Sequence, residues 1–234
     1  MRSYRAHRPI RAIGKRCGLR PRPSRRPLRH HHDLLLLEVL KAMATVRLGH
    51  RPVLLIVDVQ VGVMAEAWQA ERVIANVKTA VARARAAQVP VLWVQHGDAE
   101  MPRDSASWQW VPGLGPQGEE LLIHKAFNSA FEHTPLEQTL AQLGATHLFL
   151  AGASTNWCIR ATAYAALERG YDLTLVQDAH TTQSIPLGDG QEIAAESIVR
   201  ELNVVMQWLS YPGRRNAVAK ADALDFNAAG AAHG

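Results

Sequence analysis

Three residues that can do covalent chemistry follow three separate apolar runs. Asp58 interrupts the run VLLIVDV, Lys125 directly follows LLIH, and Cys158 comes six residues after HLFLAG. A carboxylate can act as a general base, a thiolate can attack a carbonyl carbon, and an ammonium group can stabilise the charges that develop. Together the three types are candidates for a general base, a stabilising cation and a nucleophile at one site.

Each of the three residues also has a structural interpretation. Asp58 could cap backbone amides at a strand end, Lys125 could simply reach water, and a lone buried cysteine is most often an inert small hydrophobe. For Cys158 the small, polar segment GASTNW before it favours the nucleophile. We expect a helix to start at the thiol, which lowers the thiol pKa and leaves free N–H groups for an oxyanion. Iodoacetamide should then label Cys158 quickly near neutral pH.

The elements that must position these residues alternate along the chain. Apolar runs and stretches of helical period follow one another from residue 52 onward. This pattern predicts an α/β fold with a doubly wound, mainly parallel sheet of about six strands and helices on both faces. Ligands in such sheets bind beyond the carboxyl ends of the strands, so the three residues should share one rim. The predicted strands are 53–59, 91–95, 121–124, 147–152, 172–177 and 216–220, and the predicted helices are 69–88, 135–143, 158–169 and 191–209.

Positive charge is concentrated at the amino end of the chain. Residues 1–32 hold ten Arg and one Lys without an acidic residue, a net charge of +11, whereas residues 43–234 carry a net charge of −5. We expect a basic, disordered extension over 1–42 and one catalytic domain over 43–234. The extension could be a start assigned upstream of a true start at Met43, a polyanion-binding arm or an Arg-rich leader. The run 30–32 of three histidines fits a solvated arm better than a metal site.

Several classes of protein are disfavoured by composition. No run of 18 apolar residues exists, so no membrane span is expected, and Cys17 and Cys158 cannot form a disulfide framework. The mildly acidic body gives no reason to expect nucleic acid binding. The glycine pattern at 113–118 spells a dinucleotide fingerprint, but no strand precedes it and Pro116 interrupts it. We expect a cytoplasmic protein that uses no cofactor.

Three motifs together resemble the isochorismatase-like cysteine hydrolases, which include nicotinamidases and N-carbamoylsarcosine amidohydrolases. The motifs are VLLIVDVQ, HKAFNSAF and LAGASTNWCIRATAYAALERGYDLTLVQDAHTT, and the resemblance covers about residues 50–210. It implies a catalytic triad of Asp58, Lys125 and Cys158. It also implies a non-proline cis peptide between Ala153 and Ser154, with the backbone N–H groups of Ser154 and Cys158 as the oxyanion hole.

The same resemblance implies the reaction class. We expect hydrolysis of a C–N bond in a small amide, ureide or carbamoyl compound, by a homo-oligomer that is a dimer or a tetramer. One alternative is an isochorismatase-type hydrolase of a non-amide substrate; Cys158 argues against it, because the true isochorismatases lack the cysteine. The other alternative is a non-catalytic binding protein on the same fold, which the complete triad disfavours.

Four further residues are candidates for the substrate pocket: Gln60, His96, Phe131 and Trp157. Gln60 could instead hold the base in place, and His96 could be a plain loop residue. Phe131 could belong to the core and Trp157 to a subunit contact. Nicotinamidases carry an Asp-x-His metal motif after the second strand, and here the order is reversed. No metal site is therefore expected.

Two aromatic and two polar residues complete the set of candidates. Trp108 and Trp110 lie in the predicted long loop 96–118, which suits a lid over an organic substrate or an oligomer interface. Asp178 and His180 end the fifth predicted strand on the expected rim. We interpret them as mainly structural, with Asp178 capping a turn.

Overall fold

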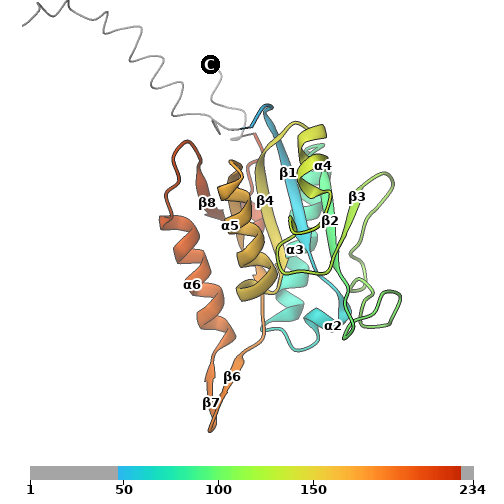
Figure 1. Ribbon diagram of the computed structural model, residues 1–234, viewed down its shortest axis with the longest axis vertical. Coiled ribbons are helices and arrows are strands. Elements are labelled where there is room, and N and C mark those ends of the chain that lie inside the picture. Colours follow the sequence, from blue (N-terminus) through green and yellow to red (C-terminus); the bar gives the residue numbers. More distant parts are fainter. Residues whose placement is uncertain (1–46, 228–234) are drawn as a thin grey trace, which may run out of the picture.

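A six-stranded parallel sheet forms the centre of the computed structural model, which describes residues 47–227 (Figure 1). The strand order is β3-β2-β1-β4-β5-β8, and every neighbouring pair is parallel. The strands are β1 Arg51–Val57, β2 Val91–His96, β3 Leu121–Lys125, β4 Ala145–Ala153, β5 Asp172–Thr181 and β8 Asn216–Ala219. The hypotheses on Cys17, the histidine run 30–32 and the division at residue 42 lie outside the described residues.

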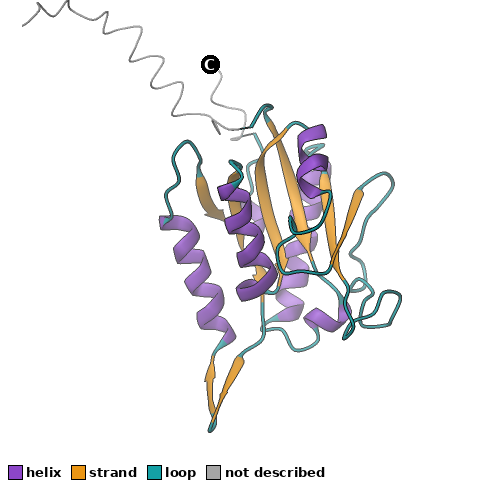
Figure 2. Cartoon of the chain, in the orientation of Figure 1, coloured by secondary structure: helices purple, strands orange, loops and turns teal. Residues whose placement is uncertain are grey.

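Helices cover both faces of this sheet, as Figure 2 shows. On one face, residues Val53, Leu55 and Val57 of β1 pack in one core cluster with residues of α4, α5 and α6. On the other face, Leu54 and Ile56 pack in a second cluster with residues of α3. The predicted doubly wound α/β fold is therefore confirmed. The helices are α2 Val61–Met64, α3 Ala70–Ala86, α4 Leu136–Gln142, α5 Arg160–Glu168 and α6 Ala195–Trp208, with a π-helical turn η1 Thr155–Ile159 and a 3₁₀ turn η2 Ala221–Ala223.

Hydrophobic spacing and glycine explain the helix bounds. In α3 the buried side chains Val73, Val77, Val81 and Ala84 recur at intervals of three and four residues, which puts them on the one face that meets the sheet. The helix α5 stops where Gly170 takes the left-handed conformation with φ +90°, which suits a residue without Cβ. None of the helices among residues 47–227 is long and apolar enough to cross a membrane.

Residues 185–193 correct one predicted helix bound. The helix expected from residue 191 begins instead at Ala195, because residues Gln191–Ile193 form strand β7. This strand pairs antiparallel with β6, Ile185–Gly188, in a hairpin that projects from the sheet (Figure 1). The connecting residues Asp189 and Gly190 both have positive φ, which the Asp-Gly pair readily supplies. The prediction that the helix already begins at residue 191 was therefore wrong.

Three smaller corrections fall at the carboxyl edge of the sheet. Strand β1 ends at Val57 rather than at residue 59, because Asp58 turns to φ +53°. Strand β5 runs to Thr181 instead of 177, with an irregular register opposite β4 that pairs Gly152 with His180. The helix expected at residue 158 is preceded by the π-helical turn η1, which begins at Thr155.

Gly152 marks the closest approach of two backbones near this edge. Its φ is +126°, and a Cβ atom added there would lie 1.9 Å from the carbonyl oxygen of Val57 on β1. No side chain fits at that distance without moving a central strand. The strand that leads to Cys158 thus depends on a residue without Cβ.

We predict that Gly152→Ala lowers the free energy of unfolding by about 4 kcal/mol or more, because the added methyl group collides with backbone that cannot move aside. Urea denaturation followed by circular dichroism measures this. Gly190→Ala is the matched control, since Gly190 also has positive φ, +74°, but nothing lies within 4 Å of its added Cβ. The control should lose only about 1–2 kcal/mol; equal losses in the two variants would contradict the collision.

Candidate active site

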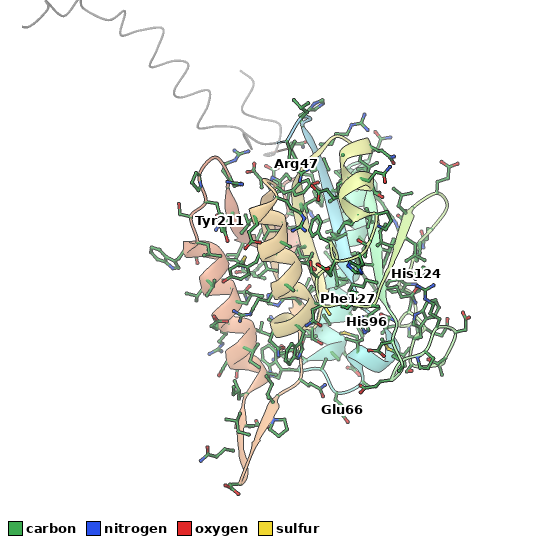
Figure 3. All side chains as sticks on the ribbon, in the orientation of Figure 1. Arg47, Glu66, His96, His124, Phe127 and Tyr211 are labelled. Carbon is green, nitrogen blue, oxygen red and sulfur yellow. The ribbon has the colours of Figure 1, made fainter. Side chains whose placement is uncertain are left out.

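The structure brings Asp58, Lys125 and Cys158 together at the carboxyl edge of the sheet. Asp58 follows β1, Lys125 is the last residue of edge strand β3, and Cys158 is the fourth residue of turn η1 after β4. Strand β2 lies between β3 and β1, so the Lys125 side chain must cross the end of β2 to reach Asp58. It does so beside His96, its register partner (Figure 3 labels His96 and the nearby Phe127).

The ammonium group of Lys125 is the common contact of this cluster. Its Nζ lies 2.6 Å from Asp58 Oδ2 and 3.2 Å from Cys158 Sγ. It also lies 3.1 Å from the carbonyl oxygen of Phe127 and 3.3 Å from Nδ1 of His96. An ammonium group has three protons to donate, so these four acceptors share them. Because Lys125 is only 3% exposed, the pairing replaces water almost completely.

The Asp58 carboxylate is buried beside this ammonium group. Its side chain is 1% exposed, and burial raises its pKa, although the charge of Lys125 and the contact with the Cys158 thiol act in the opposite direction. Burial also disfavours the charged form of Lys125, but its interactions with Asp58 and Cys158 outweigh burial and raise the Lys125 pKa. Apart from the ion pair, neither carboxylate oxygen has a hydrogen bond of good geometry among the described residues. Asp58 therefore keeps lone pairs that can accept a proton.

The thiol of Cys158 differs from the expectation. Burial, followed by the negative charge of Asp58, raises its pKa to about 12, against the opposing effect of Lys125. The predicted lowering of the thiol pKa is wrong, because Cys158 lies inside turn η1 and packs against the core rather than at an exposed helix start. At neutral pH the thiol carries its proton, and a nearby base must remove it before sulfur can attack.

The backbone before the thiol has the predicted special geometry. The peptide between Ala153 and Ser154 is cis, as expected. Directly after it, the carbonyl oxygen of Ser154 accepts hydrogen bonds from the N–H groups of Trp157 and Ile159, both at 3.1 Å. These bonds close the wide turn that carries Cys158.

Two of the four pocket candidates have other roles. Gln60 is fully buried: its amide nitrogen donates to the carbonyl oxygens of His96 and Trp108 at 3.0 and 2.8 Å, and its amide oxygen accepts from the N–H of His96 at 2.9 Å. Both N–H donors of the amide are thus used within the protein, which agrees with the alternative that Gln60 holds its neighbours in place. Phe131 is 7% exposed and packs beside Tyr171, which agrees with the alternative that it belongs to the core.

The other two candidates border the reactive cluster. His96 contacts Lys125 through Nδ1, and its Nε2 lies 2.8 Å from Asp98 Oδ2. The histidine and aspartate of the reversed motif are therefore hydrogen-bonded to each other. Trp157, next to Cys158, is 54% exposed and stays a predicted pocket wall. Sequence reasoning missed the carbonyl of Phe127, because a backbone contact of this kind leaves no residue-type signal.

The long loop and the end of β5 are anchored to the body of the protein. Trp108 stacks on His124 with ring centroids 5.7 Å apart, and Trp110 meets Trp93 edge to face at 5.2 Å. Asp178 Oδ1 accepts a hydrogen bond from the N–H of Ala221 at 2.9 Å, so it caps turn η2. This capping agrees with the structural role expected for Asp178.

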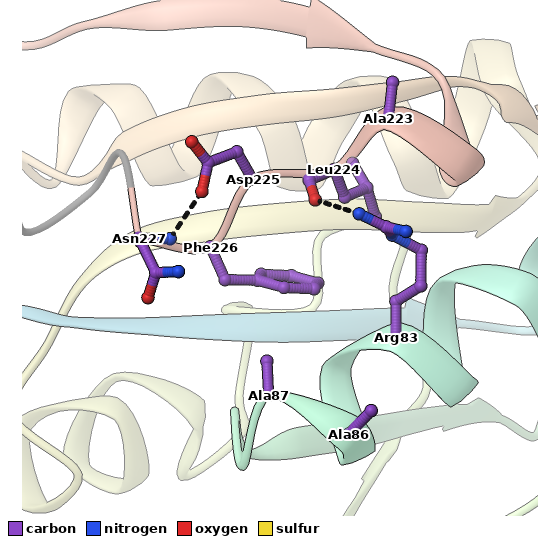
Figure 4. Close-up of a pocket in the computed structure, with 8 residues that line it drawn as sticks. All are labelled: Arg83, Ala86, Ala87, Ala223, Leu224, Asp225, Phe226 and Asn227. Carbon is purple, nitrogen blue, oxygen red and sulfur yellow. Dashed lines mark hydrogen bonds between the residues drawn. The ribbon is translucent and has the colours of Figure 1, made fainter.

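A separate cavity of about 460 Å³ lies at the end of α3, lined by Arg83, Ala86, Ala87 and the segment 223–227 (Figure 4). Arg83 Nη2 donates to the carbonyl oxygen of Leu224 at 2.8 Å across it. Because α3 ends there before β2 begins, the cavity is at the amino edge of the sheet. It is therefore remote from Cys158 and contributes nothing to the reactive cluster.

We predict that Lys125→Met lowers the free energy of unfolding by about 3–5 kcal/mol at pH 7, because it leaves the Asp58 carboxylate buried and unpaired. The loss should shrink as the pH falls through the raised pKa of Asp58, since a protonated carboxyl needs no counter-charge. Lys220→Met, which removes an exposed lysine, is the control and should change stability little. Urea unfolding between pH 4 and 8 measures both; a pH-independent loss in Lys125→Met would contradict the buried ion pair.

Comparison with known proteins identifies the family. Streptothricin hydrolase of Streptomyces noursei is 34% identical over 150 residues, which are 60% of this chain and 59% of that protein. Ureidoacrylate amidohydrolase of Enterobacter sp. (strain 638) is 28% identical over 170 residues, 59% of this chain and 71% of that protein. The chain thus spans less than two thirds of the length of the streptothricin hydrolase.

A solved structure supports the same fold. The cysteine hydrolase from Pseudomonas syringae pv. phaseolicola 1448A superposes with a TM-score of 0.68 over 79% of this chain and 94% of that one, at 19% identity. Likeness at this identity concerns the fold. The isochorismatase domain matches residues 52–209, well over half of the chain, and this protein is therefore a member of the isochorismatase family.

Proposed function

We propose that this protein hydrolyses a C–N bond of a small amide, ureide or carbamoyl compound through a thioester on Cys158. One observation carries the proposal: the buried ammonium of Lys125 lies between Asp58 Oδ2 at 2.6 Å and Cys158 Sγ at 3.2 Å. This arrangement puts a nucleophile and a base in contact with the same fixed positive charge. It is the constellation that acyl transfer through sulfur requires.

The raised thiol pKa makes Asp58 the general base. As the sulfur attacks the carbonyl carbon, the thiol proton passes to Asp58 and the carbonyl oxygen becomes an oxyanion. The N–H groups of Ser154 and Cys158 are the proposed donors to that oxygen. Lys125 stabilises the negative charge while it moves between the carboxylate and the sulfur.

The second half of the cycle restores the thiol. Asp58 gives its proton to the leaving nitrogen, the C–N bond breaks, and the acyl group stays on the sulfur as a thioester. Water then attacks the thioester and loses a proton to Asp58. The C–S bond breaks, the acid leaves, and Asp58 returns the proton to the sulfur.

The relatives support a C–N substrate over the alternatives. One is named a streptothricin hydrolase and another an amidohydrolase, and we carry only this reaction class to the present chain. A non-amide substrate would not by itself call for a cysteine with a base beside it. A purely binding role would not require a buried lysine, carboxylate and thiol in contact, an arrangement that is costly without a use.

We further propose that the protein is a homo-oligomer. The outer face of α6 carries Val204 and Trp208 four residues apart, 56% and 79% exposed, and this pair is the surface on which we place the subunit contact.

We predict that Cys158→Ala and Asp58→Asn each lower turnover by at least about 10³-fold, because removing one member of a unit that acts together removes most of the rate. The assay follows ammonia and new carboxylic acid by mass spectrometry over primary amides, ureides, carbamoyl compounds, streptothricin and ureidoacrylate. Cys17→Ala, the other cysteine of the chain, is the control and should keep full activity. Residual amidase activity near the wild-type rate in Cys158→Ala would exclude the thioester mechanism.

We predict that kcat/KM falls toward low pH with an acid limb above the ordinary carboxylate range of about 4, because protonated Asp58 cannot take the thiol proton and its pKa is raised.

Iodoacetamide should label Cys158 slowly at pH 7 and faster as the pH rises toward about 12, because the raised pKa keeps the thiol protonated. Peptide mapping after timed alkylation measures the rate, with free cysteine as reference. Labelling of Cys158 at pH 7 faster than the reference would show that the thiol is ionised at rest.

A further inference from the structure

A buried hydrogen-bonded chain joins the turn that carries Cys158 to helix α6. Oγ1 of Thr155, the first residue of η1, lies 2.9 Å from Nδ1 of His180 on β5. Nε2 of the same ring lies 3.0 Å from Oδ1 of Asn203 on α6. The amide nitrogen of Asn203 donates to the carbonyl oxygen of Gln177 at 3.0 Å. Thr155 is fully buried and His180 is 1% exposed, so no water replaces these partners.

The chemistry of the partners sets the direction of every proton in this chain. The carbonyl oxygen of Gln177 can only accept, so the amide nitrogen of Asn203 faces it and Oδ1 faces His180. Nε2 of His180 must then carry a hydrogen, and Nδ1 of the neutral ring is left as an acceptor. The hydroxyl of Thr155 consequently donates to Nδ1. Burial lowers the pKa of His180 to about 4, which keeps the ring neutral in the physiological range.

The π-helical geometry of turn η1 explains why an anchor at Thr155 would matter for Cys158. In a π-helical turn the backbone bonds span five residues, as from Ile159 to Ser154 and from Arg160 to Thr155. Such turns are wider than an α-helix, are rare, and are seen mostly as single turns at functional sites. Thr155 lies three residues before Cys158, so a shift of Thr155 moves the sulfur relative to Lys125. A displacement of about 1 Å at a reacting atom can cost about 100-fold in rate.

We propose that Thr155 and His180 are positioning residues that hold Cys158 Sγ at its working distance from Lys125 and Asp58. This inference rests on the proposed function, in which Cys158 is the nucleophile. Neither residue touches the three reactive side chains; both act through the placement of η1. Asn203 fixes the tautomer that lets His180 accept the bond.

A second histidine–threonine pair, which joins β4 to β5, provides a matched control. His147 on β4 lies with Nε2 2.8 Å from Oγ1 of Thr174 on β5. Burial lowers the pKa of His147 also to about 4. This pair lies toward the amino ends of β4 and β5, away from η1. Removing its hydroxyl therefore disrupts a comparable buried bond without moving Cys158.

The first test compares Thr155→Val, Thr155→Ser and Thr174→Val in the full chain. We expect Thr155→Val to lower kcat about 10- to 100-fold with KM within about 2-fold. Thr155→Ser, which keeps the hydroxyl, should recover most of kcat. Thr174→Val should keep kcat within about 2-fold at a similar loss of melting temperature. Equal effects of Thr155→Val and Thr174→Val on kcat would overturn the positioning role.

A second readout separates this inference from the proposed function. The rate of Cys158 alkylation by iodoacetamide, followed against pH, needs no turnover. We expect its profile to shift in Thr155→Val and to match the wild type in Thr174→Val. Superimposable profiles in all three proteins would overturn the inference even if the enzyme is active. Hydrolysis at the wild-type rate in Cys158→Ala would overturn the proposed function, whereas the alkylation profiles would still report whether Thr155 positions the sulfur.

A third measurement needs no variant and decides the case if Thr155→Val fails to fold. Nitrogen-15 NMR of the wild-type histidine rings distinguishes the two neutral tautomers. We expect His180 to carry its proton on Nε2. A proton on Nδ1 would mean that His180 donates to Thr155, and the proposed chain would be wrong.

Discussion

A buried ammonium group is the interaction on which the site depends. Lys125 stands at the end of an edge strand and reaches across β2 to a carboxylate that follows β1. Removing both charges from water is costly, and only close pairing compensates for it. Because the same ammonium also touches Cys158 Sγ and the carbonyl of Phe127, it ties three segments of the chain to one point. The parallel strand order makes this meeting possible, since it turns these strand ends to one rim.

The electrostatics of that point constrain the proposed mechanism. In a site that excludes water, a neutral thiol beside a carboxylate has a lower free energy than a thiolate, which would add a second negative charge. In the proposed mechanism the proton of Cys158 therefore moves during the attack. Lys125 stabilises the negative charge both on the Asp58 carboxylate and on the sulfur. Lys125 acts to lower the thiol pKa, but burial and the charge of Asp58 outweigh it, and turn η1 offers no exposed helix end that would add to its effect.

Departures from regular geometry concentrate at this same edge. Asp58 has positive φ, the Ala153–Ser154 peptide is cis, β5 loses its register opposite β4, and η1 is a π-helical turn. Gly152 permits the contact of β4 with β1 just before them. Regular strands and helices elsewhere hold this irregular edge in place, so the reactive side chains stand on a rigid frame.

Much of this arrangement follows from the sequence alone. Apolar runs with intervening helical periods determined the doubly wound sheet, and the strand ends marked Asp58, Lys125 and Cys158 as neighbours. The resemblance to a known family, rather than any local rule, implied the cis peptide at Ala153–Ser154. The first two features are local or follow from strand order, which explains why a single sequence carries them. The turn of the β6–β7 hairpin was also readable, since Asp189–Gly190 is a strong turn signal, but helical periodicity was given too much weight.

Only the tertiary structure decided the protonation state of Cys158 and the contacts that hold the site residues in place. The raised pKa of Cys158 arises from burial by residues distant in the chain, and no motif reports desolvation. Gln60 binds the backbone of His96, and His180 reaches Thr155, because side chains from separate strands and loops meet at fixed distances. Residue types show which chemistry is available, whereas packing determines which atoms are in contact and which have lost their water. For this reason the sequence indicated the reactive groups, and the fold determined how they are held and charged.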